Sequence, residues 1–229
     1  MVYHFAAEGA KIIFTYLKED EDAETVIEVL ARHNVEHLVF SGDLSDRDHA
    51  KNIVVQSLKK FGVINCLVNN IAQQYETKDF ENISSQQLEY LFRVNVFSFF
   101  YLAQEVLPQM TEGDSIINST SVTAYRGSHH LIDYATTKSA IVGFTRSLAQ
   151  RVIKAGVRVN AVAPGPVWTP LIPASYDAQQ VAEFGAHSPI GKPAQPADVV
   201  PTYVFLASAD SRYFSGQVLH PNGGEIIGG

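Results

Sequence analysis

The fold is decided by the stretch SIINSTSVTAYRGSHHLIDYATTKSAIVGFTRSLAQRVIKAGVRVNAV at residues 115–162. It begins and ends with short apolar runs, Ser115–Asn118 and Val157–Val162, which are typical of buried β-strands. Between them, apolar residues recur at helical spacing over Asp133–Ala155. Two strands of this continuous apolar kind, joined through a helix, indicate parallel strands in a sheet that is covered on both faces.

The same alternation of short apolar runs and longer helical patterns extends through the whole chain. The expected strands are Lys11–Tyr16, His37–Phe40, Ile64–Val68, Ser115–Asn118, Val157–Val162 and Gln217–His220. The expected helices are roughly Asp22–His33, Asp46–Phe61, Ser84–Met110, Asp133–Ala155 and Pro196–Ser208. We expect Asp133 and Gly156 to cap the fourth of these helices. No linker or repeat divides residues 1–229, so the sequence predicts one α/β domain with a doubly wound parallel sheet.

The composition is that of an ordinary globular protein. The chain has 229 residues, of which 46% are hydrophobic and 18% charged, so it can bury one large core. The net charge of -7 and the lack of a basic block argue against a nucleic-acid surface. We see no secretory signal at the N-terminus and no apolar stretch of the roughly 18 residues that a membrane span requires. Cys66 is the single cysteine and can form no internal disulfide, so we expect a cytoplasmic protein.

Tyr134 and Lys138 form the strongest candidate for a catalytic pair. Of the 10 tyrosines, only Tyr134 is followed by a lysine four positions later, which places both side chains on one face of a helix. An ammonium about 4 Å from the phenol, at an effective dielectric constant near 20, would be worth roughly 4 kcal/mol and would lower the phenol's pKa toward neutrality. Ser121 follows the strand Ser115–Asn118, at the end of a parallel sheet where ligands bind. An accidental pair, with Tyr134 packed and Lys138 solvated, is the alternative.

Further motifs occur in a fixed order around this pair. They are Gly42-Asp43-Leu44, Asn69-Asn70-Ile71-Ala72, Arg93-Val94-Asn95-Val96, Ile117-Asn118-Ser119-Thr120-Ser121, Arg158 to Thr169 with Pro164-Gly165 inside, and Gly216-Gln217-Val218-Leu219 with Asn222-Gly223-Gly224. Each motif alone is weak, but their order and spacing from Phe5 to Gly224 resemble the short-chain dehydrogenase/reductase family in its compact single-domain form. The resemblance implies an oxidoreductase that uses NAD or NADP to interconvert an alcohol and a carbonyl, and that forms a homodimer or homotetramer.

The resemblance also implies roles for individual residues. Tyr134 would exchange a proton with the reacting oxygen, Ser121 would hold that oxygen, and Lys138 would lower the pKa of Tyr134 and bind the nicotinamide ribose. Asn95 would support a water relay behind the lysine. The implied cofactor-binding residues are Asp43, Asn70, Ala72, Tyr134, Lys138, Pro164, Gly165 and Thr169.

The sequence departs from the family pattern at its start. The family begins with a strand and a glycine-rich turn whose backbone amides receive the pyrophosphate, whereas the 15 glycines of this chain include no Gly-x-Gly. The absent strand would lie centrally in the sheet, between Lys11–Tyr16 and Ile64–Val68. We therefore expect an N-terminally incomplete domain, from a truncated gene or gene model, that binds dinucleotide poorly. The alternative is a chain that has lost catalysis and at most associates with intact relatives through Ser84–Met110.

Four features stay open between a functional and a structural role. Asp43 contacts the adenine, or else it caps the helix that follows it. Asn69 supports the site, or else it pins neighbouring strands together. Lys18 and Glu19 stand side by side where a basic residue would favour NADP and an acidic one NAD, so the choice of cofactor is open. Ile71 stands where the family has a small residue, and we expect its branched side chain to crowd the cofactor.

The remaining candidates concern the substrate and the subunit contact. His129-His130 has no third ligand at useful spacing, so we predict no metal site and expect at most a substrate contact. Trp168, with the apolar residues after it, forms a lid over the substrate or packs in the core. The helix Ser84–Met110 is apolar nearly all round, which in a single domain indicates a subunit interface.

Overall fold

The sheet of the protein is built from six parallel strands in two parts. The structure is a computed structural model that describes residues 1–227. The strands are β1 (Ile12–Tyr16), β2 (His37–Ser41), β3 (Cys66–Asn69), β4 (Ser115–Ser119), β5 (Arg158–Val162) and β6 (Val218–Leu219). β1 pairs with β2, and the other four form a second sheet in the order β3-β4-β5-β6, with every pairing parallel.

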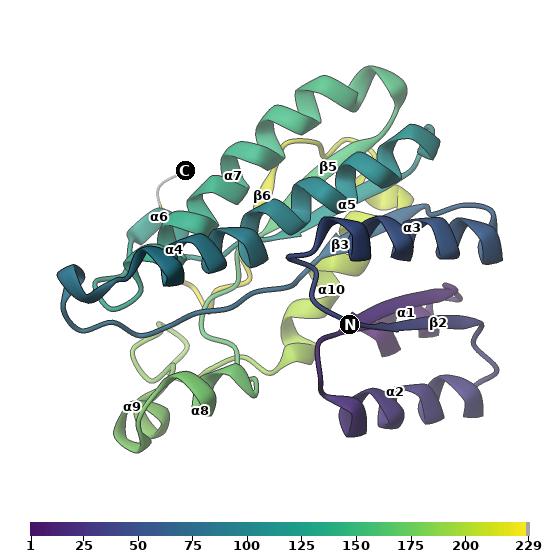
Figure 1. The fold of residues 1–229 in the computed structure, drawn as a ribbon. Coiled ribbons are helices and arrows are strands. Elements are labelled where there is room, and N and C mark those ends of the chain that lie inside the picture. Colours follow the sequence, from purple (N-terminus) through teal and green to yellow (C-terminus); the bar gives the residue numbers. More distant parts are fainter. Residues whose placement is uncertain (228–229) are drawn as a thin grey trace.

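Helices cover both faces of these strands. The α-helices are α1 (Val2–Ala7), α2 (Asp20–Arg32), α3 (Arg47–Phe61), α4 (Ser85–Phe92), α5 (Ser98–Val106), α6 (Thr123–Arg126), α7 (Ile132–Val152), α8 (Leu171–Ser175), α9 (Ala178–Glu183) and α10 (Pro196–Ala207). A π-helical turn, η2 (Arg93–Phe97), joins α4 to α5, and short 3-10 helices are η1 (Phe80–Asn82), η3 (Leu107–Gln109), η4 (Ile153–Ala155) and η5 (Ala209–Ser211). Figure 1 shows α3, α5 and α7 along one face and α1, α2 and α10 along the other, which is the predicted doubly wound arrangement. Across residues 1–227, no helix is long and apolar enough to cross a membrane.

The strands of the larger sheet are apolar at successive positions because both of their faces are buried. Ile116 and Ile117 of β4 are both fully buried, although neighbouring side chains of a strand point to opposite faces. Ile116 belongs to an apolar cluster with residues of α3, α5 and α7. Ile117 belongs to a second cluster with Leu206 of α10. A continuous apolar run is therefore what a strand between two helical layers requires.

The sheet is interrupted between β1 and β3. Within the described residues, β1 is hydrogen-bonded only to β2, and β3 only to β4. The interruption falls where the sequence analysis expects a central strand. Met1 and Phe5, at the N-terminal helix, pack against the same apolar cluster as Cys66 and Val68 of β3. The two parts of the sheet are therefore joined by side-chain packing and not by strand pairing.

The predicted strands are confirmed, whereas some helix boundaries differ. The predicted helix over Ser84–Met110 is confirmed as a continuous helical segment from Ser85 to Gln109, although it contains the π-helical turn η2 between α4 and α5. The prediction that Asp133 caps the next helix is wrong, since α7 begins at Ile132, and Asp133 Oδ2 instead accepts a hydrogen bond from Gln87 Nε2 at 2.7 Å. Gly156, at φ 79°, ends the helical segment as predicted. The short helices α8 and α9 were not predicted.

Candidate active site

A cavity of about 360 Å³ lies at the carboxyl ends of the larger sheet. Its wall includes Asn70 after β3, Ser121 after β4 and Pro164 after β5, together with Tyr134 and Lys138 of α7. The carboxyl ends of parallel strands meet at one edge, and open α/β sheets bind their ligands there. The cavity is therefore the first candidate for the functional site.

The cavity brings together most of the residues proposed from the sequence. The lining residues among them are Asn70, Ala72, Ser121, Tyr134, Lys138, Pro164, Gly165 and Thr169. Asp43 and Asn95, which were proposed with them, are not part of the wall. These residues come from segments that are far apart in the chain, so the fold assembles the site as the order of the motifs predicted.

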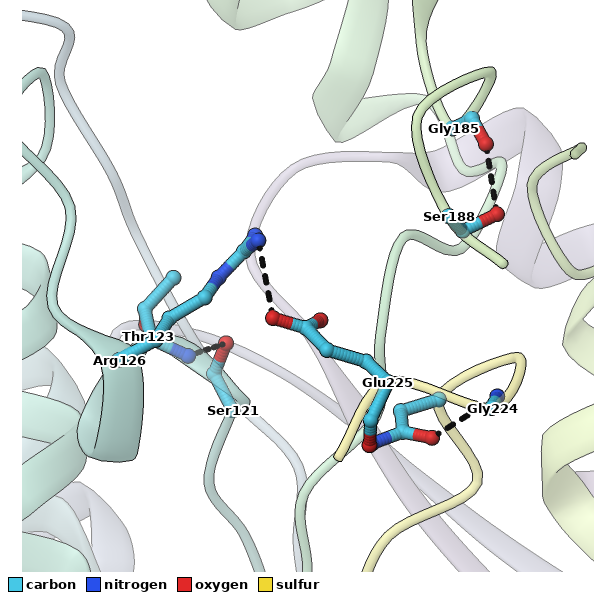
Figure 2. Close-up of polar contacts among 8 residues, drawn as sticks. Ser121, Thr123, Arg126, Gly185, Ser188, Gly224 and Glu225 are labelled. Atoms are coloured by element: carbon cyan, nitrogen blue, oxygen red, sulfur yellow. Dashed lines mark hydrogen bonds and ion pairs between the residues drawn. The ribbon is translucent and has the colours of Figure 1, made fainter. Parts of the chain in front are cut away.

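Ser121 and Tyr134 place two hydroxyl groups in this cavity. Ser121 Oγ accepts a hydrogen bond from the backbone N–H of Thr123 at 3.2 Å (Figure 2), which leaves the hydroxyl proton of Ser121 free to be donated. Burial raises the pKa of the Tyr134 phenol above its ordinary value of 10.0, and hydrogen bonding to Ser121 lowers it by a smaller amount. Tyr134 is therefore protonated at neutral pH and can donate its proton.

Lys138 is one of the most deeply buried side chains of the protein. Its exposed fraction is 1%, and its ammonium donates a hydrogen bond to the backbone carbonyl of Ser119 at 3.0 Å. Burial lowers the pKa of Lys138 from 10.5 to about 7, because the charged form loses its hydration. From the sequence, Lys138 was expected to lower the pKa of Tyr134. In the structure burial has the larger effect on the phenol, and the pKa of Tyr134 rises.

Asn95 ties the loop after β3 to α7. It lies in the π-helical turn η2 and is fully buried. Its Oδ1 accepts a hydrogen bond from Gln73 N at 2.7 Å, and its Nδ2 donates to Gln73 O at 2.9 Å and to Thr137 Oγ1 at 3.0 Å. Such π-helical turns are frequent at functional sites. The Asn95 side chain therefore holds the wall of the cavity in place from behind.

Comparisons with known proteins decide the family. A family model described as enoyl-(acyl carrier protein) reductase matches residues 1–225. The chain belongs to the short-chain dehydrogenase/reductase family. Glucose and ribitol dehydrogenase of Daucus carota is 48% identical over 99% of this chain and 80% of its own length. NADPH-dependent aldehyde reductase 1, chloroplastic, of Arabidopsis thaliana is 47% identical over 98% of this chain and 81% of its own length.

A solved structure extends the comparison to the fold. A blue fluorescent protein from a metagenomic library, crystallised in complex with NADPH, is 29% identical and has a TM-score of 0.90. The match covers 97% of this chain and 90% of that protein. Because the named relatives are a dehydrogenase and a reductase, this short-chain dehydrogenase/reductase is an oxidoreductase by class.

A polar chain that sequence reasoning missed lies in the wall of the cavity of this short-chain dehydrogenase/reductase. The hydroxyl groups of Ser119 and Tyr203 are 2.7 Å apart, and Ser119 Oγ donates to Asn70 Oδ1 at 2.7 Å. Burial raises the pKa of Tyr203 to about 12, so its hydroxyl stays protonated at neutral pH. The available signal was a single tyrosine in the largely apolar second half of helix α10. Tyr203 therefore links α10 to Ser119 at the end of β4. The backbone carbonyl of the same Ser119 accepts the hydrogen bond from Lys138.

Two of the open assignments now have structural descriptions. Asp43 does not cap α3, because the cap is Asp46, whose Oδ1 accepts from Asp48 N at 2.9 Å. Asp43 Oδ1 instead accepts from Ser45 N at 2.8 Å in the turn after β2. Asn69 Nδ2 donates to Asn118 Oδ1 at 2.9 Å, so this residue pins β3 to β4.

The cavity fits one half of a nicotinamide dinucleotide better than the other. Lys138 and Thr169 lie in its wall, where the resemblance expects the ribose and carboxamide contacts. No glycine-rich turn is present in the sequence to receive the pyrophosphate, and Met1 forms part of the wall. Ile71 packs against the first apolar cluster and is not part of the wall, so the expected crowding by Ile71 is not seen.

The remaining sequence candidates lie around the mouth of the site. Among residues 1–227, no group of three or more His, Cys, Asp or Glu side chains could hold a metal ion. The rings of His129 and His130 are 3.6 Å apart, and His130 Nδ1 is 3.8 Å from Glu76 Oε1. Trp168 is 38% exposed and its ring lies 6.4 Å from that of Phe184, so it is not a core residue.

Proposed function

We propose that this chain is a single-domain oxidoreductase that uses NAD or NADP to interconvert an alcohol and a carbonyl. The observation that carries the proposal is one cavity walled by Ser121, Tyr134, Lys138 and the Pro164-Gly165 loop. The names of the relatives, a glucose and ribitol dehydrogenase and an aldehyde reductase, support small sugars, polyols and aldehydes as substrates.

Tyr134 is the general acid and base in this proposal. In the reduction, its protonated phenol donates to the carbonyl oxygen as that oxygen gains charge, and in the oxidation the phenolate takes the proton back. Ser121 donates its free hydroxyl proton to the same oxygen and so fixes the position of the substrate. Bound nicotinamide supplies or accepts the hydride.

Lys138 combines two tasks. With a pKa of about 7, it can gain or lose a proton at neutral pH and so can return a proton to Tyr134. We propose that it and Thr169 hold the nicotinamide half of the cofactor, and that Asn70 and Ala72 line the same side. Asn95 positions this wall through Gln73.

We also propose that residues 1–229 by themselves bind the dinucleotide weakly, because these residues include no glycine-rich turn for the pyrophosphate. Titration with NADH and with NADPH, followed by nicotinamide fluorescence, tests this directly. We expect half-saturation in the millimolar range for both. Micromolar binding of either cofactor would contradict the proposal of weak binding and would also settle which cofactor is preferred.

The activity is tested by the oxidation of NADPH or NADH in the presence of hexanal, an aldehyde without other polar groups. At saturating cofactor, Tyr134→Phe is expected to lower the rate at least about 100-fold, because the proton donor is lost. Tyr125→Phe is the matched control, since the Tyr125 hydroxyl is buried without a partner outside the cavity wall. Equal rates for the two variants would exclude Tyr134 as the acid.

A second candidate function is association without catalysis. Phe97 and Phe100, on the segment from η2 to α5, are 43% and 41% exposed and lie one helical turn apart. We propose that this face contacts a second copy or an intact relative. The protein could fail to bind NADH and NADPH and fail to reduce hexanal, and yet self-associate. In that case this second candidate function replaces the first.

A further inference from the structure

A second cavity of about 740 Å³ adjoins the catalytic one. Arg126, Pro166, Tyr176 and Phe184 line both cavities, so the two share a wall. A substrate whose reacting carbon lay near Tyr134 and that was too long for the inner cavity would have to pass these four residues to enter the outer cavity. The side chains where the two cavities meet would contact the part of such a substrate that does not react.

An ion pair stands at this passage. Arg126 Nη1 lies 3.2 Å from Glu225 Oε1, and Figure 2 shows the two side chains pointing toward one another, with the turn at Gly185 and Ser188 beyond them. Arg126 comes from α6, just after the catalytic Ser121, and Glu225 from the C-terminal segment after β6. The side chain of Glu225 is 24% exposed and that of Arg126 53%, so both can still contact a ligand.

Gln74 supplies an unused donor on the catalytic side of the same passage. It lines the inner cavity and is 8% exposed, yet its Nε2 has no hydrogen-bond partner. It is close enough to the hydroxyl of Tyr176, a residue of the shared wall, for a hydrogen bond that lowers the pKa of that phenol, and this contact uses at most one of the two amide N–H groups. A buried amide N–H that is left unpaired is costly, and such groups in native structures call for an explanation. A substrate hydroxyl or carbonyl oxygen in the cavity would accept this hydrogen bond.

The nearby Gln180 provides an internal comparison. Its Nε2 donates to Glu76 Oε1 at 2.7 Å, which uses one of its two amide N–H groups. Gln74 Nε2, in contrast, has no partner within hydrogen-bonding geometry.

The charges around the outer cavity disfavour an anionic substrate. Two carboxylates, Glu183 and Glu225, line it against one guanidinium, that of Arg126, which Glu225 already neutralises. A phosphate or carboxylate would have to displace Glu225 from Arg126. It would then lie beside the Glu225 carboxylate, which repels it. A neutral hydroxyl group both donates and accepts hydrogen bonds, so it can bond to Gln74 and to a carboxylate without breaking the ion pair. An alkyl chain would leave these polar groups unpaired.

We propose that Gln74 and the Arg126–Glu225 ion pair determine specificity, selecting neutral, hydroxyl-rich substrates and rejecting their phosphate esters. This inference rests on the proposed function and goes beyond it by naming which substrates are excluded and which groups exclude them. Gln74 positions the substrate by a hydrogen bond next to the reacting carbon. Glu225 holds Arg126 so that the guanidinium is not available to an anion.

Direct binding tests the proposal without depending on turnover. Ribitol and ribitol 5-phosphate differ only in the charged group, and saturation-transfer NMR measures millimolar binding of each to the full chain. We expect ribitol to bind at least about fivefold more tightly than its phosphate ester. Equal affinity, tighter binding of the ester, or no detectable ribitol binding would overturn the proposal, and none of these outcomes requires a variant.

Two variants assign the effect to residues. Glu225→Gln is expected to reduce the ratio of the two affinities, ribitol over ribitol 5-phosphate, at least about threefold, because it frees Arg126 to bind the phosphate. Gln74→Leu is expected to weaken ribitol binding roughly tenfold. Glu24→Gln, on the exposed surface of α2, is the matched control and should change neither. If Glu225→Gln leaves the preference unchanged, the ion pair is not the selecting group.

Turnover of hexanal separates this inference from the proposed function. If hexanal is not reduced but ribitol binds selectively, the proposed function fails and the binding site stands. If hexanal is reduced and ribitol does not bind, the specificity proposal fails and the proposed function stands.

Discussion

The ammonium nitrogen of Lys138 lies 5.4 Å from the centre of the Tyr134 ring, over the aromatic face. Its hydrogen bond goes to the backbone carbonyl of Ser119 and not to the phenol. The two residues predicted to act as a pair are therefore adjacent, yet burial shifts the pKa of each in its own direction: it raises that of Tyr134 and lowers that of Lys138. The shift at Lys138 has measurable consequences.

Replacing Lys138 by methionine is expected to stabilise the fold while removing activity. A buried ammonium with few partners disfavours the folded state, and substitution of buried charges by apolar residues of similar size commonly stabilises by roughly 1–4 kcal/mol. We expect the free energy of unfolding at pH 6 to rise by an amount in that range, measured by urea denaturation. Lower stability of Lys138→Met at this pH would show that the ammonium is well solvated or paired in the folded protein.

The same lysine predicts a pH dependence of stability. Its pKa is lowered from 10.5 in the unfolded chain to about 7 in the fold, so between these values the unfolded state binds more protons. Stability from this group therefore rises with pH from about 7 to 10.5 and is constant below that window. The difference in unfolding free energy between Lys138→Met and the unmodified chain should shrink across this range. A constant difference would contradict the lowered pKa.

Loss of the Asn95 side chain is expected to destabilise the protein and loosen the cavity wall. Asn95→Ala removes three hydrogen bonds and leaves the backbone of Gln73 without partners in the interior. We expect a loss of about 2–4 kcal/mol in the free energy of unfolding. Asn82→Ala, which removes one exposed bond at 3.3 Å, is the matched control and should change stability by less than about 0.5 kcal/mol.

Addition of a methyl group at Gly165 is expected to disturb the loop above the cavity. A Cβ at this position would lie 2.8 Å from the Asn222 Cα, and a backbone atom cannot move aside as a side chain can. We expect Gly165→Ala to destabilise by about 1–3 kcal/mol. In contrast, Gly143 of α7 has open space around it, and Gly143→Ala should stabilise by up to about 1 kcal/mol. Thermal unfolding of both variants compares the two glycines directly.

The proposed subunit contact is tested on its exposed aromatic residues. Phe97→Lys places a charge on the face that we expect a second copy to cover, and should raise the dimer dissociation constant at least about tenfold. Sedimentation equilibrium measures this constant. Phe80, which is 68% exposed elsewhere on the surface, gives the matched control Phe80→Lys. Similar effects of both substitutions would argue against a specific interface at Phe97.

The elements that could be predicted from sequence are those that follow from local patterns. All six strands were found because each contains a short apolar run, such as Ile116-Ile117 of β4, where both neighbouring side chains are buried. The π-helical turn at Arg93–Phe97 was missed because one inserted residue changes the hydrogen bonding but hardly changes the apolar pattern around it. Asp133 was predicted to be a helix cap because aspartate is frequent at helix starts. Its side chain instead bonds to Gln87, which is 46 residues away in the sequence and could not be found from local pattern.

Some residues of the candidate site could likewise be predicted from local sequence patterns, and others could not. Ser121, Tyr134 and Lys138 could be located because their spacing follows from one strand and one helix. Gln74 and Tyr203 could not, since their importance comes from what each lacks or contacts in three dimensions: an unpaired amide, and a hydroxyl 2.7 Å from Ser119. The pKa of Tyr134 was expected to fall and instead rises, because sequence gives the neighbouring charge but not the degree of burial.

The interruption between β1 and β3 gives the protein two regions of unequal resistance to local opening. The amides of β1 and β2 are held by a single ladder, whereas those of β4 lie between two. Local unfolding can release the smaller region by separating packed side chains, without breaking any ladder of the larger sheet. Amide protons of Phe14 and Val39 should therefore exchange with deuterium through a low-energy opening, while those of Ile116 and Ile117 should wait for global unfolding.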